Sequence, residues 1–185
     1  NIGMVLKTLR DAGLEKNTLV YFISDNGGPI TRNAPNASQN TPLRGGKGET
    51  WEGGIRVPFI LNWKGHLKAG VTCTQPVIQM DVTATVLALA GVQVDAKWPM
   101  DGVSLLSLLN APEKGEAPHK MLCWEYGPQW AIREGDWKLT YALPDISTKK
   151  PVLGLYDVSK DIGERRDLAA EQPDLVKKLQ ANWET

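Results

Sequence analysis

The chain has 185 residues, enough for one ordinary domain with a substantial core. Its 21 basic and 21 acidic residues cancel, and no basic run marks a surface for nucleic acid or for a membrane. No apolar stretch approaches the roughly 18 residues that a membrane-spanning helix needs. We therefore expect neither nucleic acid nor a membrane as a partner.

The first part of the chain is patterned as an α/β unit. Apolar residues recur at helical spacing over residues 2–9, and Gly13 is well placed to end that helix. An uninterrupted apolar run follows at residues 19–23, and such a run is typical of a strand covered on both faces in a parallel sheet. A second buried strand is expected at residues 57–63. Helix, short loop and buried strand together predict an α/β fold with parallel-type strands.

A long loop separates these two strands. Residues 27–54 are rich in Gly, Asn, Pro and Thr, and long loops inside compact domains usually carry function. After the second strand, Asp81 is expected to cap a helix that Gly91 closes, and residues 103–109 read as a further short helix. Asn1 already lies within a helical pattern and no signal peptide is visible, as expected of a piece cut from a longer chain.

The pattern changes near residue 116. Short strand-like runs separated by turn signals follow a stretch of linker composition; they lie at residues 121–124, 130–133, 137–141 and 154–156. Gly135 and Asp136 suit a hairpin turn, and Pro173 opens a last helix. We therefore predict two parts, an α/β part over residues 1–115 and a small antiparallel sheet with a terminal helix over residues 116–185.

Several potentially reactive side chains show no functional pattern. Cys73 and Cys123 have neither the spacing of metal ligands nor that of a disulfide framework, so buried structural thiols are favoured, with one disulfide as the alternative. His66 and His119 have no neighbouring ligand pattern and are expected to be incidental surface residues. Asn36 opens a glycosylation sequon, which has meaning only in a secreted eukaryotic protein.

Asp25 and Asn26 directly follow the first predicted strand, within the sequence Ser-Asp-Asn-Gly-Gly. In open α/β sheets, ligands bind beyond the carboxyl ends of the strands. A carboxylate next to an amide offers two oxygen donors to a hard divalent cation. A simple turn is the alternative, because all these residue types favour turns.

Lys47 lies between Gly46 and Gly48, so its backbone surroundings carry no side-chain bulk. An ammonium in such a loop can approach an anion closely and stabilise charge in a transition state. The loop is not a P-loop, because Thr41 stands where that motif requires Gly and Gly48 where it requires Ser or Thr. A solvated surface lysine is the alternative for this residue taken alone.

Together these segments resemble the signatures of the type I sulfatase family, within the alkaline-phosphatase-like superfamily. The resemblance rests above all on the string Lys47-Gly48-x-x-Trp51-Glu52-Gly53-Gly54-x-Arg56-x-Pro58. Preceded by Pro42-Leu43-Arg44-Gly45-Gly46, that string is most similar to the branch acting on sulfated sugars, including N-acetylgalactosamine sulfatases and arylsulfatase B-like enzymes. The resemblance continues at lower specificity through the rest of the chain, for example over residues 101–105 and 133–139.

The resemblance implies a function and a site. Asp25 and Asn26 would be two ligands of one divalent cation, usually Ca²⁺, and Lys47 would bind the sulfate and take part in catalysis. Glu52 and Arg56 would be structural, with a buried ion pair between them. The part before residue 116 would be the C-terminal part of the catalytic domain. The substrate would be a sulfated small molecule or glycan, and the compartment the periplasm, the lysosome or the exterior.

The family's nucleophile, a Cys or Ser converted to formylglycine, has no counterpart here. Neither Cys73 nor Cys123 is followed by the Pro (or Ala) and Arg of that motif, and two acidic metal ligands, the catalytic histidines and a second lysine are also unmatched. The chain is therefore expected to be the C-terminal fragment of a sulfatase, inactive without the remainder of the sulfatase chain. Two alternatives stay open: a phosphoester or phosphonate hydrolase of the same superfamily, and a non-catalytic module that binds anionic glycans.

Overall fold

The computed structural model of the protein describes residues 1–30, 38–113, 116–144 and 150–185. Asn36, which opens the sequon, lies outside these residues. The chain divides into two compact units: unit 1 comprises residues 1–23 and 58–119, and unit 2 comprises residues 24–57 and 120–185. The predicted division at residues 115 and 116 refers to the domains of a longer enzyme and stays a prediction.

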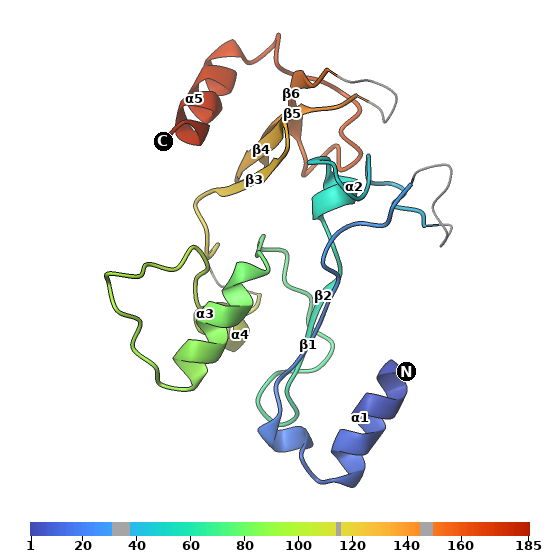
Figure 1. The fold of residues 1–185 in the computed structure, drawn as a ribbon, viewed down its shortest axis with the longest axis vertical. Coiled ribbons are helices and arrows are strands. Elements are labelled where there is room, and N and C mark those ends of the chain that lie inside the picture. The colour runs from blue at the N-terminus through green and yellow to red at the C-terminus, as the bar shows by residue number, and fades with distance from the viewer. Residues whose placement is uncertain (31–37, 114–115, 145–149) are drawn as a thin grey trace. The chain divides into compact units, whose positions relative to one another are not determined.

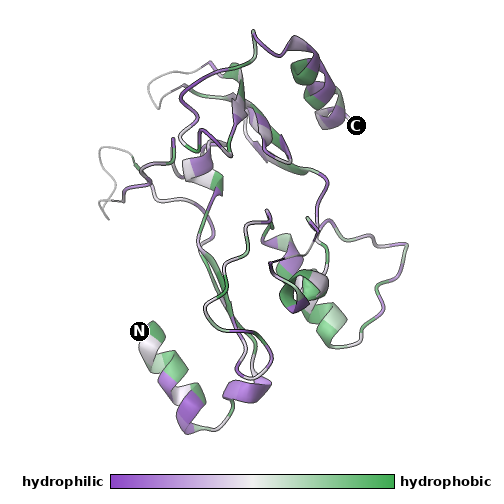
Figure 2. Ribbon diagram, turned by 180° about the vertical axis from the view of Figure 1, so that it is seen from behind, coloured by the Kyte–Doolittle hydropathy of each residue, from purple (hydrophilic) through white to green (hydrophobic). Residues whose placement is uncertain are grey.

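Unit 1 contains the first helices and two short strands. Its elements are α1 (Ile2–Asp11), the 3₁₀ helix η1 (Glu15–Asn17), β1 (Val20–Ile23), β2 (Phe59–Asn62), α3 (Met80–Leu89) and α4 (Leu106–Asn110) (Figure 1). Gly13 and Gly91 each adopt a φ of +70° just after a helix, so both predicted helix ends are confirmed. In Figure 2, α1 shows hydrophobic and hydrophilic residues side by side, whereas α3 is mostly hydrophobic.

Strands β1 and β2 pair with each other, and they pair antiparallel, with Val20 opposite Asn62. The α/β class is confirmed, but the expectation of parallel strands is wrong for this pair. Parallel neighbours need a crossover, usually a full helix, and in the described part of the connecting segment the only helix is the four-residue α2 (Glu52–Ile55). Neither strand is covered on both faces, because Phe22 is 43% and Ile60 57% exposed.

Asp81 does not cap its own helix, which is a second correction. Its fully buried carboxylate accepts hydrogen bonds from the backbone N–H groups of Ile78 and Val103, both at 2.9 Å. Nε2 of His119 lies 2.8 and 2.9 Å from the two carboxylate oxygens. His119 is therefore a largely buried structural partner of Asp81 and not an incidental surface residue. Asp81 ties the start of α3 to the segments on both sides of α4.

Unit 2 is built on a four-stranded sheet. Its strands are β3 (Leu122–Tyr126), β4 (Gln129–Glu134), β5 (Trp137–Ala142) and β6 (Val152–Asp157), paired antiparallel in chain order and followed by α5 (Pro173–Trp183) (Figure 1). The predicted small antiparallel sheet and terminal helix are thus confirmed. Gly135, with a φ of +58°, lies in the predicted turn between β4 and β5.

The terminal helix packs on this sheet through its apolar side chains. Leu179 is fully buried against Ile132, Leu139 and Leu155. Trp183 stacks on Trp130, with ring centroids 5.0 Å apart and planes within 10°. These contacts join α5 and the sheet in one hydrophobic core. Burial of side chains of this size stabilises the folded state by about 1.5–3 kcal/mol each.

Both cysteines are free and exposed, so the expected buried thiols are wrong. Cys123 lies on the edge strand β3 beside the fully buried Ile132, and the edge position leaves it accessible. Cys73 lies in an irregular segment between β2 and α3. His66 is exposed, as expected, and stacks on the ring of Trp63 with centroids 4.1 Å apart.

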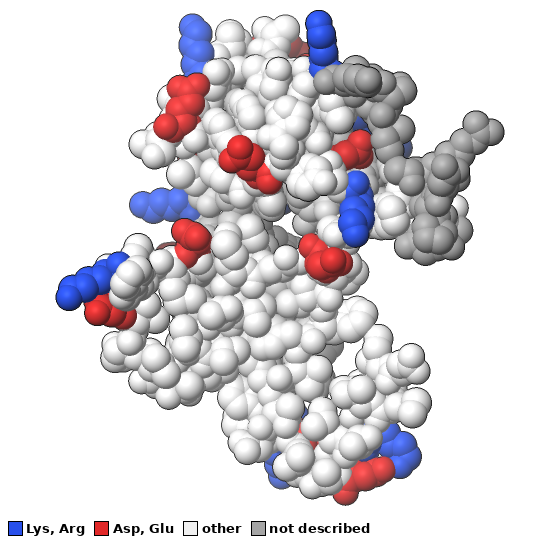
Figure 3. Space-filling view, in the orientation of Figure 1, with Lys and Arg blue, Asp and Glu red and all other residues white. Residues whose placement is uncertain are grey.

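In the described segments, no helix combines the length and the apolar character needed to pass through a bilayer. The face in Figure 3 carries scattered basic and acidic side chains, with the two signs interspersed.

We expect Asp81→Ala to destabilise the folded protein by about 3 kcal/mol, because two half-buried N–H groups and His119 would lose a fully buried acceptor. Thermal unfolding of the full-length protein would measure the loss. The control is Asp101→Ala, which removes an exposed aspartate and should stay within about 0.5 kcal/mol of the parent. Equal melting temperatures for the Asp81→Ala variant and the parent would contradict the assigned role.

Candidate functional site

Asp25 and Asn26 form a turn directly after β1. The backbone N–H of Asn26 donates to Oδ1 of Asp25 at 3.0 Å, and the side-chain Nδ2 of Asn26 donates to the carbonyl of Gly27 at 2.9 Å. The amide nitrogen is therefore held by the backbone, which leaves Oδ1 of Asn26 as the atom able to ligate a cation. Asp25 is exposed and Asn26 half-buried, so both can be reached from outside unit 2.

Backbone hydrogen bonds join this turn to the Lys47 loop. The N–H of Gly27 donates to the carbonyl of Gly54 at 2.9 Å, and the N–H of Lys47 donates to the carbonyl of Gly28 at 3.3 Å. The approach is so close that a Cβ added to Gly27 would lie 1.6 Å from the carbonyl oxygen of Gly53. Only glycine fits there. The two glycine-rich segments singled out from the sequence are thus parts of one assembly.

Asn40 fastens the same assembly, and the sequence analysis missed it. Its Oδ1 accepts from the N–H of Gly28 at 3.0 Å. Its Nδ2 donates to the carbonyls of Gly28 and Gly45, at 2.8 and 3.0 Å. A side-chain amide can donate and accept at once, so one residue satisfies three backbone groups. Its position in a loop rich in Asn and Gly hid this role, because Asn is expected in any such loop.

The loop holds the backbone of Lys47 in a defined conformation. Gly45 and Gly48 adopt φ values of +73° and +84°, in the left-handed region that favours glycine. The N–H of Gly46 donates to Oε2 of Glu49 at 2.8 Å. The side chain of Lys47 is exposed, and no ion pair within the described residues engages its ammonium.

Trp51 anchors the end of the loop in the core of unit 2. The residue is 1% exposed, and its indole Nε1 donates to the carbonyl of Leu143 at 2.6 Å. Its ring meets that of Tyr156 edge-on, with centroids 5.7 Å apart. The guanidinium of Arg44 lies 3.6 Å from the centre of the Trp51 ring, a cation–π contact worth about 1–2 kcal/mol when shielded from water.

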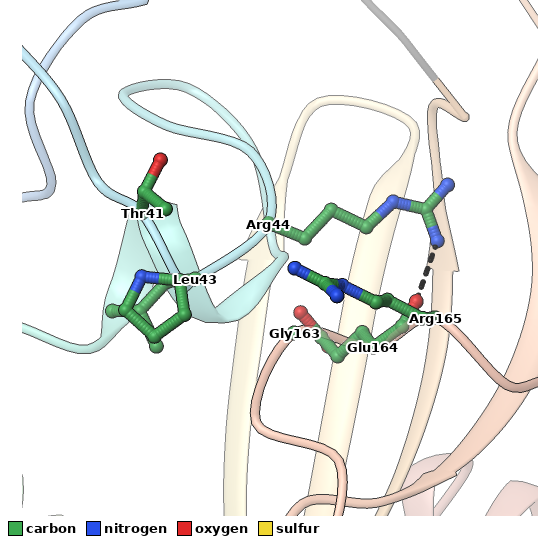
Figure 4. Close-up of a pocket in the computed structure, with 7 residues that line it drawn as sticks. Thr41, Leu43, Arg44, Gly163, Glu164 and Arg165 are labelled. Carbon is green, nitrogen blue, oxygen red and sulfur yellow. Dashed lines mark hydrogen bonds between the residues drawn. The ribbon is translucent and has the colours of Figure 1, made fainter.

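Arg44 also lines a surface hollow of about 510 Å³ between residues 41–44 and 163–165 (Figure 4). Its guanidinium donates to the carbonyls of Glu164 and Pro144, both at 3.1 Å. These bonds and the contact with Trp51 engage Arg44 in holding the loop, so it is poorly suited to bind an external anion. The three predicted site residues do not line this hollow, and we place the candidate site at Lys47 instead.

A buried ion triad lies at the start of α2. Nζ of Lys138, a fully buried residue on β5, is 3.0 Å from Oε1 of Glu52 and 2.8 Å from Oε1 of Glu164. The backbone N–H of Glu52 also donates to Oε2 of Glu164 at 2.7 Å. Lys138 and Glu164 thus form a fully buried ion pair, with both side chains 0% exposed. The pair expected between Glu52 and Arg56 exists at 3.4 Å, but the Arg56 side chain is 48% exposed and Lys138 is the principal partner.

The two carboxylates of the triad differ in the direction of their pKa shifts. Burial raises the pKa of Glu164, and the charge of Lys138 offsets only part of that effect. Burial opposes ionisation of Glu52 too, but Lys138, Arg133 and Arg56 together outweigh it and lower the pKa of Glu52. Glu164 has a φ of +50°, a strained value for a residue other than glycine. Two acids share one cation, and Glu164 is the acid that takes up a proton first as pH falls.

These shifts predict opposite pH dependences for two variants. Because its pKa is raised in the folded state, Glu164 contributes fully to stability below its unfolded pKa of roughly 4.3. That contribution is lost as pH rises through the pKa of Glu164 in the folded state. Glu164→Gln should therefore gain stability relative to the parent as pH rises from about 4. Because the pKa of Glu52 is lowered in the folded state, Glu52 contributes to stability above its unfolded pKa. That contribution is lost as pH falls through the pKa of Glu52 in the folded state.

Glu52→Gln should accordingly be destabilised at neutral pH and approach the parent in strong acid. Urea unfolding of the parent and both variants, at a series of pH values from about 3 to 7, would measure the two trends. The same trend in both variants would contradict the assignment of the two carboxylates.

Two family models match the chain. The model described as Sulfatase matches residues 1–92, and that described as N-sulphoglucosamine sulphohydrolase, C-terminal, matches residues 47–184. The chain is also 32% identical to steryl-sulfatase of Mus musculus, over 92% of this chain and 32% of that protein. It thus spans about a third of the length of that relative.

Solved structures show the same likeness. The likeness to Ps i-CgsB in complex with k-i-k-neocarrahexaose covers 99% of this chain and 39% of that protein's chain, with a TM-score of 0.83 and 29% identity. The likeness to a protein in complex with its substrate D-glucosamine-2-N,6-O-disulfate covers 99% of this chain and 36% of that protein's chain, with a TM-score of 0.74 and 25% identity.

Proposed function

Because this chain belongs to the type I sulfatase family, we propose that it works as the C-terminal part of an enzyme that hydrolyses sulfate esters of carbohydrates. Two similar structures hold k-i-k-neocarrahexaose and D-glucosamine-2-N,6-O-disulfate, which supports a sulfated sugar as the substrate. A periplasmic, secreted or lysosomal location is proposed with it, on the family alone.

The backbone assembly that joins the Asp25-Asn26 turn to the Lys47 loop is the observation that best supports this function. It brings segments with two oxygen donors and an ammonium into direct contact through the bonds of Gly27 and Gly28. A sulfate group is an anion that can contact a divalent cation on one side and a lysine on the other. The arrangement suits a sulfate better than a neutral ligand, which would need neither.

Asp25 and Asn26 are proposed as two ligands of a Ca²⁺ ion. Their carboxylate and amide oxygens are the hard donors that Ca²⁺ prefers, so the residues fit the metal. Ca²⁺ takes six to eight oxygens, and the described part of the chain offers no group of three or more His, Cys, Asp or Glu for a metal. The other ligands, and the formylglycine that supplies the nucleophile, would come from the remainder of the enzyme.

Lys47 is proposed to bind the sulfate and to stabilise the charge on its oxygens as the S–O bond breaks. Such stabilisation is effective when the donor is already in place before reaction. The bonds from Asn40, Gly28 and Glu49 hold the loop in that way. Only the part of the contact that strengthens in the transition state raises the turnover number.

We expect Lys47→Ala in the full-length enzyme to lower kcat on an aryl sulfate by about 10²–10³, the usual effect of removing one preorganised donor. Lys47→Arg should recover little, because a planar guanidinium does not replace a compact ammonium. Lys177→Ala, an exposed lysine on α5, is the matched control and should keep the parent rate. Near-parent turnover in Lys47→Ala would show that Lys47 is only a solvated surface lysine.

The 185 residues alone are expected to release no sulfate and to bind Ca²⁺ only weakly, since two oxygen donors cannot replace six to eight. Calorimetric titration with Ca²⁺ and a sulfate-release assay, both on the isolated chain, measure this. The full-length enzyme, tested in parallel, should bind Ca²⁺ and turn over the aryl sulfate. Micromolar Ca²⁺ affinity of the isolated chain would contradict the proposed division of ligands.

A further inference from the structure

An exposed aromatic ring lies beside Lys47 in unit 2. Tyr126 is the last residue of β3, and 62% of its surface is exposed. Its ring lies near Gly48: a Cβ built on Gly48 would lie 3.5 Å from Cε1 of Tyr126 and 3.9 Å from its phenol oxygen. The ring therefore lies within the reach of one added methyl group from Gly48, the residue that follows Lys47.

Gln129 fixes this arrangement. It is the residue opposite Tyr126 in the pairing of β3 with β4, and it is only 3% exposed. Its Nε2 donates to the carbonyl of Gly48 at 2.9 Å, and its Oε1 accepts from the N–H of Leu143 at 3.1 Å. A buried amide satisfied at both ends constrains position strongly, because displacing it would leave buried polar groups unpaired.

Two other features define the end of this hairpin. The turn between β3 and β4 consists of Gly127, with a φ of +58°, and Pro128, whose ring restricts its own φ. The hydroxyl of Thr50 lies 3.2 Å from that of Thr140 and 3.5 Å from the carbonyl of Trp130. The sheet therefore holds the segment after Lys47 and presents Tyr126 next to it.

We propose that Tyr126 is a specificity-determining residue that stacks on the sugar ring whose sulfate Lys47 binds. This proposal rests on the proposed function, because it requires the sulfate at Lys47. A pyranose has an apolar C–H face and a polar rim, and a tyrosine offers an apolar face with a hydroxyl at its edge. Covering the exposed ring removes apolar area from water, and tyrosine loses little conformational entropy on binding.

The kinetic effect of this contact differs from that of Lys47. A ring that stacks on the sugar holds the substrate equally well before and during S–O cleavage, so its removal weakens ground-state and transition-state binding alike. Tyr126→Ala should raise KM for a sulfated sugar about tenfold and leave kcat within about twofold of the parent. Tyr126→Phe keeps the ring and should behave as the parent.

The experiment uses the full-length enzyme with N-acetylgalactosamine 6-sulfate and D-glucosamine-2-N,6-O-disulfate as sugar substrates. Inorganic sulfate, measured as a competitive inhibitor of 4-methylumbelliferyl sulfate hydrolysis, probes the Lys47 site without any sugar ring. Trp98→Ala, in which a 77% exposed aromatic of unit 1 is removed, is the matched control. Melting temperatures of the variants report on folding.

A tenfold higher KM for the sugar in Tyr126→Ala, with an unchanged inhibition constant for sulfate and parent-like Tyr126→Phe and Trp98→Ala, would support the proposal. An unchanged KM, or a loss in Tyr126→Phe as large as in Tyr126→Ala, would overturn it. If Tyr126→Ala raised the inhibition constant of sulfate as much as the KM for the sugar, Tyr126 would only support the loop. That result would also overturn the proposal. If the parent enzyme hydrolyses the aryl sulfate but neither sugar, the proposed substrate class fails and this inference with it. Failure on all three substrates would overturn the sulfatase function itself.

Discussion

The buried ammonium of Lys138 is the interaction on which the candidate site depends. It holds Glu52, at the start of α2, and Glu164, in the segment after β6. Leaving one member of a buried pair without its partner costs about 3–5 kcal/mol, so these contacts are kept or lost together. The glycine-rich loop ends at the first residue of α2, and the triad therefore ties the end of that loop to the sheet of unit 2.

The rest of unit 2 extends this constraint toward Lys47. Trp51 fills the core beside the triad, Arg44 covers its ring, and Asn40 binds the backbone of the loop to the Asp25-Asn26 turn. A lysine on a loop held in this way needs little reorganisation when an anion binds. That is the property that makes a single charge effective in stabilising a transition state.

The parts of the fold that depend on local sequence could be predicted. The short strands beyond residue 120 and the helix that begins at Pro173 follow from apolar periodicity and from turn residues such as Gly135. The glycines that close α1 and α3 were predicted from the same kind of signal.

The parts that depend on distant contacts could not be predicted. Lys138 lies in a strand pattern where a lysine suggests an exposed position, and its partner Glu52 is 86 residues away. His119 and Asp81 are 38 residues apart, and no ligand spacing connects them. The direction of β2 relative to β1 depends on how the long intervening segment returns, and apolar runs carry no information on that.

Unit 1 carries apolar side chains that remain exposed to solvent in this structure. Ile2, Met4 and Val5 on α1 are 55%, 70% and 60% exposed, although the helix has a strongly amphipathic pattern. Ile60 on β2 is 57% exposed. Given that the chain spans about a third of steryl-sulfatase, we expect the remainder of the proposed enzyme to cover these side chains.

A crystal structure of the full-length protein with Ca²⁺ and inorganic sulfate would test the central claim most directly. We expect oxygens of Asp25 and Asn26 at about 2.3–2.6 Å from the Ca²⁺ ion, the distance typical of this metal. We also expect Nζ of Lys47 within about 3 Å of a sulfate oxygen, with the loop in the conformation described above. A Ca²⁺ ion bound without Asp25 and Asn26, or a sulfate held away from Lys47, would contradict the account.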